Sequence, residues 1–348
     1  MLFDTSFDIK NIIYSYFYDL KDTINLYNLN KDHQDNIRII NLYDTEYKNI
    51  NRLNQQIIEQ NKYKHVEKLN VYNNTKIHNV NHMKNTLKIL NCCDHNGKSM
   101  IDQKGISEIS LIELYVYGNT KIENVNHMKN TLKILNCGDR NGNSRIDQKG
   151  ISEISLVELY AFNNKKIENV NCMKNTLKIL DCSYCSGIDQ NGILELNLIE
   201  LYAKANEKIK NVNHMKETLK ILNCGWNSGI DQNGISQLNL IELNAIRNKR
   251  IKNANHMKET LQILNCSFDS GIDQNGISKL NLIELNAHSN QNIKNVNHMK
   301  NTLKILNCSY DSGIDQDGIS ELNLIELYAF DNKKIKNMDH MKNTKYIK

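Results

Sequence analysis

Apolar and polar positions recur at a fixed spacing along most of this 348-residue chain. From Leu156 onward, equivalent leucines follow one another every 21 residues, as at Leu177. Two earlier steps, such as that from Leu87 to Leu111, are 24 residues long. A fixed period in this range predicts a solenoid of stacked supersecondary units rather than a single globular core. The first apolar residues of the thirteen units are Val66, Leu87, Leu111, Leu132, Leu156, Leu177, Leu198, Leu219, Leu240, Leu261, Leu282, Leu303 and Leu324.

Each unit has apolar residues at its first, fourth and sixth places. In LIELNAHSN (282–290) these are Leu282, Leu285 and Ala287, an alternation that predicts a short strand with one side turned inward. The ninth place is asparagine in every second unit. A buried asparagine needs hydrogen-bond partners, which the backbone of adjacent turns can supply, so we expect an asparagine ladder along the coil. Its members are Asn74, Asn119, Asn164, Asn206, Asn248, Asn290 and Asn332.

The pattern resembles leucine-rich repeats, and the resemblance covers Val66 to Thr344. It implies an α/β fold: a curved solenoid with parallel strands on the concave side and short helices or turns on the convex side. The alternate units, such as LKILDCSYC (177–185) followed by Ile-Asp-x-x-Gly-Ile, are similar to the cysteine-containing repeats of F-box proteins. The asparagine-rich style also resembles repeat proteins encoded by giant DNA viruses of amoebae.

Residues 1–36 do not repeat. They predict a helical N-terminal cap over the open apolar face of the first coil, which such arrays require. They also resemble a degenerate F-box, although its leading Leu-Pro falls on Thr5-Ser6. The matching positions, in order, are Asp8-Ile9, Ile13, Ser15-Tyr16-Phe17, Asp22 and Asn30-Lys31. An F-box resemblance implies docking to a Skp-family linker protein of a cullin-type ubiquitin ligase, through Ile9, Ile12, Ile13, Tyr16 and Phe17.

The rest of the chain divides around the repeats. Residues 37–65 follow the first segment as a connector or as a degenerate first repeat, whose apolar residues would be those at 37, 40 and 42. The array of thirteen short repeats occupies 66–344. Residues 345–348 are expected to form an uncapped tail, because lysines fall on the first and fourth places of what would be the next strand.

Charge and hydropathy argue against two classes of partner. The 44 basic and 39 acidic residues give a net charge of only +5, and the lysines recur evenly with the repeat. This is typical of a solvated face, so we do not expect nucleic-acid binding. No apolar run approaches the roughly 18 residues of a membrane helix, and residues 1–30 lack the pattern of a signal peptide, so no membrane association is expected.

Six of the nine cysteines share one inward strand place, two coils apart or about 9.5 Å. A disulfide needs Cα atoms within about 7 Å, so these cysteines cannot pair with one another. Buried free thiols imply a reducing compartment, so we expect a cytoplasmic protein, or one of the host cytoplasm if its source is viral. The six are Cys92, Cys137, Cys182, Cys224, Cys266 and Cys308.

The polar motifs do not indicate catalysis. Recurrent histidines, such as His214 and His256, lie two coils apart, whereas zinc holds its ligands at about 2.1 Å. Asp-Gln-x-Gly sequences, as at 231–234, lack the further ligands of a calcium loop, and a turn or helix cap explains them. We therefore predict neither an enzyme nor a bound metal or cofactor.

The side chains between the inward apolar places, at places three, five and seven, should face the concave surface. Exposed aromatic side chains on such a face are typical anchors for a protein partner, although they could also simply stack on one another. We therefore predict a protein-interaction module, favouring the substrate-recognition adaptor of a Skp-linked ubiquitin ligase. The alternative is a non-enzymatic scaffold or decoy that binds a host or cellular protein, with the N-terminal helices acting only as a cap. The predicted partner-binding residues are Tyr115, Tyr117, Tyr160, Phe162, Tyr202, Lys204, Trp226, Tyr328 and Phe330.

Overall fold

The computed structural model describes residues 39–44, 53–95, 97–337, 339–341 and 343–347. The segment predicted as a helical cap or F-box, with Ile9, Ile12, Ile13, Tyr16 and Phe17, lies outside the described residues. The chain forms two compact units, Met1–Leu159 and Tyr160–Lys348, and each has its own set of stacked coils.

Each coil contributes one three-residue strand, and within each unit successive strands pair in parallel in chain order. The shared register places equivalent residues opposite each other, as in Leu243↔Leu264. The first unit contains β1 (Asn41–Tyr43), β2 (Lys68–Asn70), β3 (Ile89–Asn91), β4 (Glu113–Tyr115) and β5 (Ile134–Asn136). The strand β6 (Glu158–Tyr160) lies at the border of the two units. The second unit contains β7 (Ile179–Asp181), β8 (Glu200–Tyr202), β9 (Ile221–Asn223), β10 (Glu242–Asn244), β11 (Ile263–Asn265), β12 (Glu284–Asn286), β13 (Ile305–Asn307), β14 (Glu326–Tyr328) and β15 (Lys345–Ile347).

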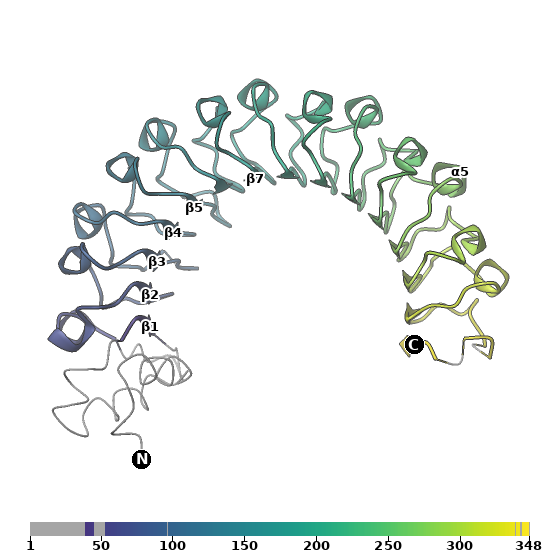
Figure 1. Cartoon of the computed structure of the whole chain (residues 1–348), viewed down its shortest axis with the longest axis horizontal. Coiled ribbons are helices and arrows are strands. Elements are labelled where there is room, and N and C mark those ends of the chain that lie inside the picture. The colour runs from purple at the N-terminus through teal and green to yellow at the C-terminus, as the bar shows by residue number, and fades with distance from the viewer. Residues whose placement is uncertain (1–38, 45–52, 96, 338, 342, 348) are drawn as a thin grey trace, which may run out of the picture. The chain divides into compact units, whose positions relative to one another are not determined.

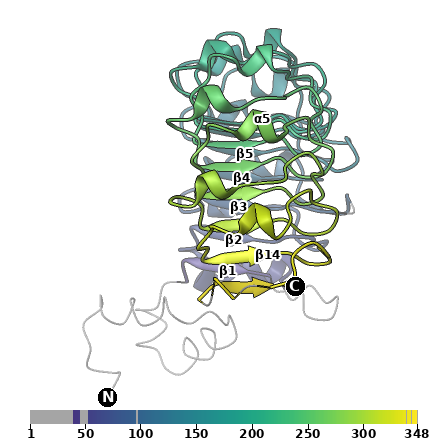
Figure 2. The same ribbon diagram turned by 90° about the vertical axis from the view of Figure 1, so that its right-hand side faces the viewer.

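Short helical turns lie on the opposite side of the coils, with two in the first coil and none among the described residues between Tyr328 and Lys345. Figure 1 shows the strands on the inner edge of each unit and the helical turns on its outer edge, and Figure 2 shows the coils of the second unit stacked on one another. The first unit has α4 (Gln55–Ile58), η2 (Asn61–Tyr63), η3 (Asn81–Met83), η4 (Lys104–Ile106), η5 (Asn126–Met128) and η6 (Lys149–Ile151). The second has η7 (Asn171–Met173), η8 (Asn191–Ile193), η9 (Asn213–Met215), η10 (Asn233–Ile235), η11 (Asn255–Met257), α5 (Gln274–Ile277), η12 (Asn297–Met299) and η13 (Asp317–Ile319).

The inward places predicted from the sequence form the core. Leu240, Leu243 and Ala245, at the first, fourth and sixth places of one repeat, are fully buried. Ile251 and Met257, which follow in the same coil, are buried as well. Each coil therefore closes its apolar side against the coils before and after it, as expected for an array that has no other core.

The asparagine ladder predicted from the sequence is present. Asn248 is buried, and its Nδ2 donates to the carbonyl oxygens of Cys224 at 2.8 Å and Ile230 at 3.0 Å, both in the preceding coil. Its Oδ1 accepts from the backbone N–H of Arg250 at 2.9 Å. Asn206, Asn290 and Asn332 make the same three kinds of bond, so one side chain satisfies backbone groups of two neighbouring coils.

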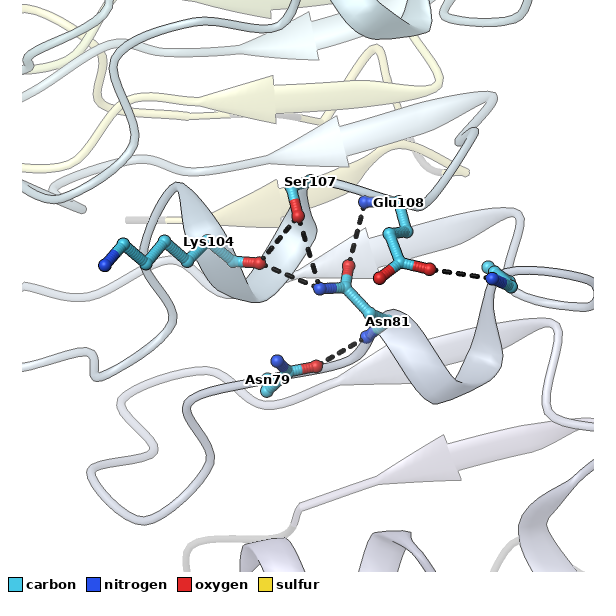
Figure 3. A network of polar contacts seen from close by, with 6 residues as sticks. Asn79, Asn81, Lys104, Ser107 and Glu108 are labelled. Carbon is cyan, nitrogen blue, oxygen red and sulfur yellow. Dashed lines mark hydrogen bonds and ion pairs between the residues drawn. The ribbon is translucent and has the colours of Figure 1, made fainter.

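A second asparagine column, on the side of the helical turns, was not predicted from the sequence. Asn81 Nδ2 donates to the Lys104 carbonyl oxygen at 2.8 Å, and its Oδ1 accepts from the Glu108 N–H at 3.0 Å (Figure 3). Asn126, Asn171, Asn213, Asn255 and Asn297 repeat both bonds to the following coil. The signal for this column in the sequence is the asparagine that begins each Asn-His-Met-Lys or Asn-Cys-Met-Lys sequence.

The first and last strands differ from the register read along the sequence. In and just before β1, Ile39 and Leu42 are buried, whereas Ile40, one of the three expected apolar residues of the first coil, is exposed. Residues 345–347, expected to belong to a tail, form β15, and Lys345 pairs with Glu326. Counting 21 residues from Leu324 puts Lys345 at a first place, but the last coil is two residues shorter, so Lys345 takes a third place.

Candidate functional site

The strand face of the second unit carries partly exposed side chains at the third and fifth places of its coils. Tyr202 donates from its hydroxyl to Glu200 Oε2 at 2.8 Å, and Tyr328 donates in the same way to Glu326. Burial, supported by the bond to Glu200, raises the pKa of Tyr202 to about 12. Tyr160 occupies the same fifth place in β6 and is also partly exposed. These three predicted residues therefore lie on the strand face.

Carboxylates recur on this face in every second strand. Glu242 in β10 and Glu284 in β12 are separated by Ile263 in β11, in one register. Burial raises the pKa of Glu242, and the carboxylates of Glu284 and Glu200 add to that rise. The face therefore has an acidic row, whose members in the second unit are Glu200, Glu242, Glu284 and Glu326.

A shallow depression of about 260 Å³ lies on this face over β12, β13 and β14. Two members of the acidic row, Glu284 and Glu326, line it together with Ile305 and the predicted residue Tyr328. Its lining thus combines carboxylates with an aliphatic and an aromatic side chain, and the depression is open to solvent.

At the carboxyl ends of the strands, rings and cations of successive coils contact one another. The Phe162 and Tyr184 ring centroids are 6.4 Å apart. The Lys204 Nζ atom lies 5.3 Å from the Tyr184 centroid and 5.0 Å from the Trp226 centroid. The Arg247 guanidinium carbon lies 4.1 Å from the Trp226 centroid. Two cations are therefore each held against aromatic rings from neighbouring coils.

The same series continues toward the last coils without a break. The Arg247 guanidinium is 4.5 Å from the Phe268 centroid. The His288 ring centroid is 4.7 Å from that of Phe268 and 4.8 Å from that of Tyr310, which is in turn 5.3 Å from Phe330. Burial lowers the pKa of His288, which favours its neutral ring between the two aromatic side chains. We call this series the aromatic–cation column: Phe162, Tyr184, Lys204, Trp226, Arg247, Phe268, His288, Tyr310 and Phe330.

Backbone geometry at the eighth place makes this column possible. Tyr184, Trp226, Arg247, Phe268 and Tyr310 all have φ between 55° and 62°, in the left-handed region that side-chain-bearing residues rarely adopt. The chain turns sharply there at the end of each strand. The side chain at an eighth place is consequently brought into contact with side chains at the seventh or eighth places of adjacent coils.

In the first unit, the two predicted tyrosines occupy equivalent places. Tyr115 donates from its hydroxyl to Glu113 Oε2 at 2.9 Å, and burial raises its pKa to about 12 with a smaller contribution from that bond. The His95 ring lies edge-on between Tyr72 and Tyr117, with centroids 5.3 Å from each. The first unit thus has its own short series of edge-on rings.

The structure separates the predicted partner-binding residues into three groups. Phe162, Lys204, Trp226 and Phe330 belong to the aromatic–cation column. Tyr160, Tyr202 and Tyr328 lie on the strand face at fifth places, and Tyr115 and Tyr117 lie in the first unit. The prediction omitted five column members: Tyr184, Arg247, Phe268, His288 and Tyr310. Their signal in the sequence is a large side chain at the seventh or the eighth place of each successive coil: the two places alternate along most of the column, whereas Trp226, Arg247 and Phe268 are all at the eighth place.

A row of exposed aliphatic side chains at the second place was also missed. Ile199, Ile241, Ile283 and Ile325 are exposed in the second unit, directly before β8, β10, β12 and β14. The alternation of Leu-Ile-Glu-Leu with Leu-Lys-Ile-Leu or Leu-Gln-Ile-Leu is the sequence signal for this row.

The recurrent histidines contact the backbone. His214 Nε2 lies 3.0 Å from the Ile193 carbonyl oxygen of the preceding coil, and His256 Nε2 lies 3.0 Å from that of Ile235. Because a carbonyl only accepts, these imidazoles donate from Nε2. Within the described ranges, no group of three or more His, Cys, Asp or Glu side chains is placed to hold a metal ion.

The Asp-Gln-x-Gly sequences close helical turns, in agreement with their predicted capping role. Asp231 Oδ1 accepts from the Gly234 N–H at 2.9 Å, and the Gly234 carbonyl accepts from the Val212 N–H of the preceding coil at 3.0 Å. A Cβ atom at Gly234 would overlap the Lys210 carbonyl oxygen. Glycine is required there by the close approach of two coils.

A comparison with solved structures agrees with this architecture. A chain of the crystal structure of the yeast Rad7 and Elc1 complex aligns with 98% of this chain and 92% of its own length, at 15% identity and a TM-score of 0.52. The fold is a leucine-rich repeat solenoid. A leucine-rich repeat protein of Leptospira interrogans aligns with 83% of this chain and 68% of its own length, at 18% identity and a TM-score of 0.35. No protein-family model and no curated protein sequence matches the chain. Among the helices that the structure describes, none has the length and apolar character needed to cross a membrane.

Proposed function

We propose that this protein is a protein-interaction module and that the aromatic–cation column of the second unit is its principal docking surface. The observation that carries the proposal is the unbroken series of nine side chains, each in contact with the next. Tryptophan, tyrosine and arginine dominate binding hot spots, and this column presents all three. Because the side chains already pack against one another, less conformational entropy is lost when a partner covers them.

The finer proposal is that the protein serves as the substrate-recognition adaptor of a Skp-linked ubiquitin ligase. It is supported by the F-box resemblance of residues 1–36 and by the cysteine-containing repeats. The yeast structure that shares the fold contains Rad7 together with Elc1, so that solenoid was solved with a protein partner. The alternative is a scaffold or decoy without a ligase, in which residues 1–36 only cap the coils.

Binding to a Skp-family linker tests the finer proposal. The full-length chain and the variant Ile12→Asp/Phe17→Asp would be co-purified with a purified Skp-family linker, and circular dichroism would establish that both are folded. Retention by the first and loss by the folded variant supports the adaptor role. If the linker does not retain the wild-type chain, the adaptor role is rejected in favour of the scaffold alternative. If the variant unfolds, residues 12 and 17 stabilise the coils, as a cap would.

Charge reversal in the column tests the docking surface. Partners cross-linked to the wild-type chain in its source cells would be identified by mass spectrometry and compared with those of Lys204→Glu/Arg247→Glu. A matched control is Lys216→Glu/Lys258→Glu, which makes the same charge change beside the helical turns. Loss of a defined partner from the column variant alone supports the proposal. Equal recovery by all three chains contradicts it.

A further inference from the structure

The second and third places of the coils together form a regular apolar stripe on the second unit. At the second place, Ile241, Ile283 and Ile325 expose 41%, 44% and 60% of their surface. Leu240 and Leu243 are fully buried, whereas the two residues between them, Ile241 and Glu242, both reach solvent. The second place is therefore part of the same accessible surface as the third.

The intervening coils supply isoleucine at the third place instead. Ile263 in β11 and Ile305 in β13 are partly exposed and lie in register with the acidic row. Backbone bonds place second-place residues side by side, since the Ile283 N–H donates to Gln262 and the Lys304 N–H donates to Ile283, both at 2.9 Å. The isoleucines thus zigzag between two rows. We call this the isoleucine stripe: Ile221, Ile241, Ile263, Ile283, Ile305 and Ile325.

Opposite charges border the stripe. The second-place row, on the amino-terminal side of the strands, fills its remaining positions with Lys220, Gln262 and Lys304. The third-place row fills its remaining positions with the acidic row. Among the described residues of the second unit, neither Glu242 nor Glu284 has an ion-pair partner within 4.0 Å, whereas Glu326 pairs with Lys345. Burial raises the pKa of Glu242, and repulsion from Glu284 and Glu200 adds to that rise. A cation placed over the row would relieve the repulsion.

We propose that the isoleucine stripe binds an amphipathic α-helix that has basic residues along one flank and acidic residues along the other. This inference rests on the proposed role as a protein-interaction module and adds a second docking surface to the aromatic–cation column. The apolar seam of the helix would cover the isoleucines, its basic flank would face the acidic row, and its acidic flank would face Lys220 and Lys304. Both flanks would then be complementary in charge, which favours one alignment over others.

The spacing of the stripe fits a helix. The a and d positions of a helix alternate on the two sides of its seam and repeat every seven residues, about 10.5 Å. The stripe repeats every two coils, about 9.5 Å. The drift of about 1 Å per repeat is small enough for side chains to adjust over two or three heptads. The flank charges also determine direction, because turning the helix end for end would place acidic residues over the acidic row.

A helix suits this face better than an extended segment does. The strands beneath the stripe already use their N–H and C=O groups in bonds to neighbouring coils, as between Ile241 and Lys220. An extended segment lying across them would find no backbone partners, whereas a helix satisfies its own backbone groups internally.

Designed peptides of about three heptads test this inference with the full-length chain. All three peptides carry leucine at the a and d positions. The first, called the mixed-flank peptide, has lysine on one flank and glutamate on the other. The second has glutamate on both flanks, and the third has lysine on both. Binding would be measured by fluorescence anisotropy of a labelled peptide at low and high salt. We expect the mixed-flank peptide to bind most tightly, and Glu242→Lys/Glu284→Lys to weaken it at least tenfold. That variant should instead prefer the peptide with two acidic flanks.

The control variant Glu217→Lys/Glu259→Lys makes the same charge change outside the strand face and should keep the wild-type order of the peptides. Ile241→Asp/Ile283→Asp should weaken all three peptides. Binding of the mixed-flank peptide no tighter than that of a scrambled peptide overturns the inference, as does an unchanged preference in Glu242→Lys/Glu284→Lys. If these peptides fail while a natural partner still depends on Lys204 and Arg247, the proposed function stands and only the helical partner is rejected.

Discussion

The Arg247 guanidinium lies over the Trp226 ring, 4.1 Å from its centroid. It also approaches the Phe268 ring of the next coil at 4.5 Å, so one cation joins three successive coils. These contacts are attractive because the face of an aromatic ring carries negative charge density. The same residues therefore stiffen the surface that we propose for docking and contribute to the stability of the array.

A double-mutant cycle should detect this coupling. For Trp226→Ala, Arg247→Ala and the double variant, we expect an interaction free energy of about 0.5–1 kcal/mol in urea unfolding, typical of exposed cation–π pairs. Lys249→Ala is the control, because Lys249 contacts Asp269 at 3.7 Å rather than the ring. Trp226→Ala and Lys249→Ala should be additive, and additivity of Trp226→Ala and Arg247→Ala would refute the coupling.

Removing one rung of the asparagine ladder should be costly. Asn290→Ala loses bonds to the carbonyl oxygens of Cys266 and Ile272 and leaves both buried without that donor. We expect a loss of about 2–4 kcal/mol in the free energy of unfolding. Asp311 occupies the same ninth place in the next repeat but is exposed, so Asp311→Ala should change stability by less than about 0.5 kcal/mol. Similar urea midpoints for the two variants would contradict the role of the ladder.

A methyl group at Gly234 should separate two coils. The added Cβ atom would overlap the Lys210 carbonyl oxygen and crowd the Asn211 Cα at 3.2 Å, both of them backbone atoms. Since backbone cannot rotate away as a side chain can, Gly234→Ala should cost about 1–3 kcal/mol or more. Its exposed neighbour provides the control, because Asn233→Ala leaves the approach of the coils intact. Equal melting temperatures for both variants would show that the coils can move apart freely.

Stability should fall as the medium becomes acidic. Burial lowers the pKa of His214, an effect that its bond to the Ile193 carbonyl only partly opposes, and burial acts similarly on His127. The unfolded chain, with pKa values near 6.5, then binds more protons than the folded chain just below that pH. The contribution of these histidines is present above about pH 6.5 and is lost as the pH drops through their folded values.

Melting temperatures measured between pH 7.5 and pH 5 check this dependence. His127→Gln/His214→Gln removes both titrating rings while keeping a side-chain donor, so its melting temperature should vary less with pH. His78 has an exposed side chain, and His78→Gln should retain the wild-type dependence. An unaltered dependence in the double variant would assign the effect to other groups.

Thiol reactivity should divide the nine cysteines into two classes. Cys172 and Cys185 are exposed, whereas the other seven are buried. Burial raises the pKa of the Cys224 thiol to about 12, so it carries almost no thiolate near neutral pH. Partial burial raises the pKa of Cys172, so it should react more slowly than an unhindered thiol. We expect two thiols to react with a thiol reagent at pH 8 in the folded protein, one in Cys185→Ser, and the rest only after unfolding. Rapid reaction of a third thiol in the folded protein would contradict the burial of the strand cysteines.

The repeated core was predictable because its burial pattern is local. The leucines at the first and fourth places, and the asparagine at the ninth place of every second repeat, imply their environment by spacing alone, and Asn248 makes the bonds expected of it. Prediction was less accurate at the ends of the array, where the spacing changes. Ile40 is exposed rather than buried, and Lys345 pairs with Glu326 although the 21-residue count places it elsewhere.

For this protein, the sequence alone determined the solenoid, its coil length and the side of each strand that faces the core, because a fixed period forces equivalent residues into equivalent surroundings. Only the tertiary structure decided which outward side chains meet. The contact of Lys204 with Tyr184 and Trp226 depends on parallel register and on the left-handed turn at the eighth place, and the spacing of apolar residues contains neither. The aromatic–cation column is therefore a consequence of how coils stack, since its members are distant in the chain and adjacent only in the folded protein.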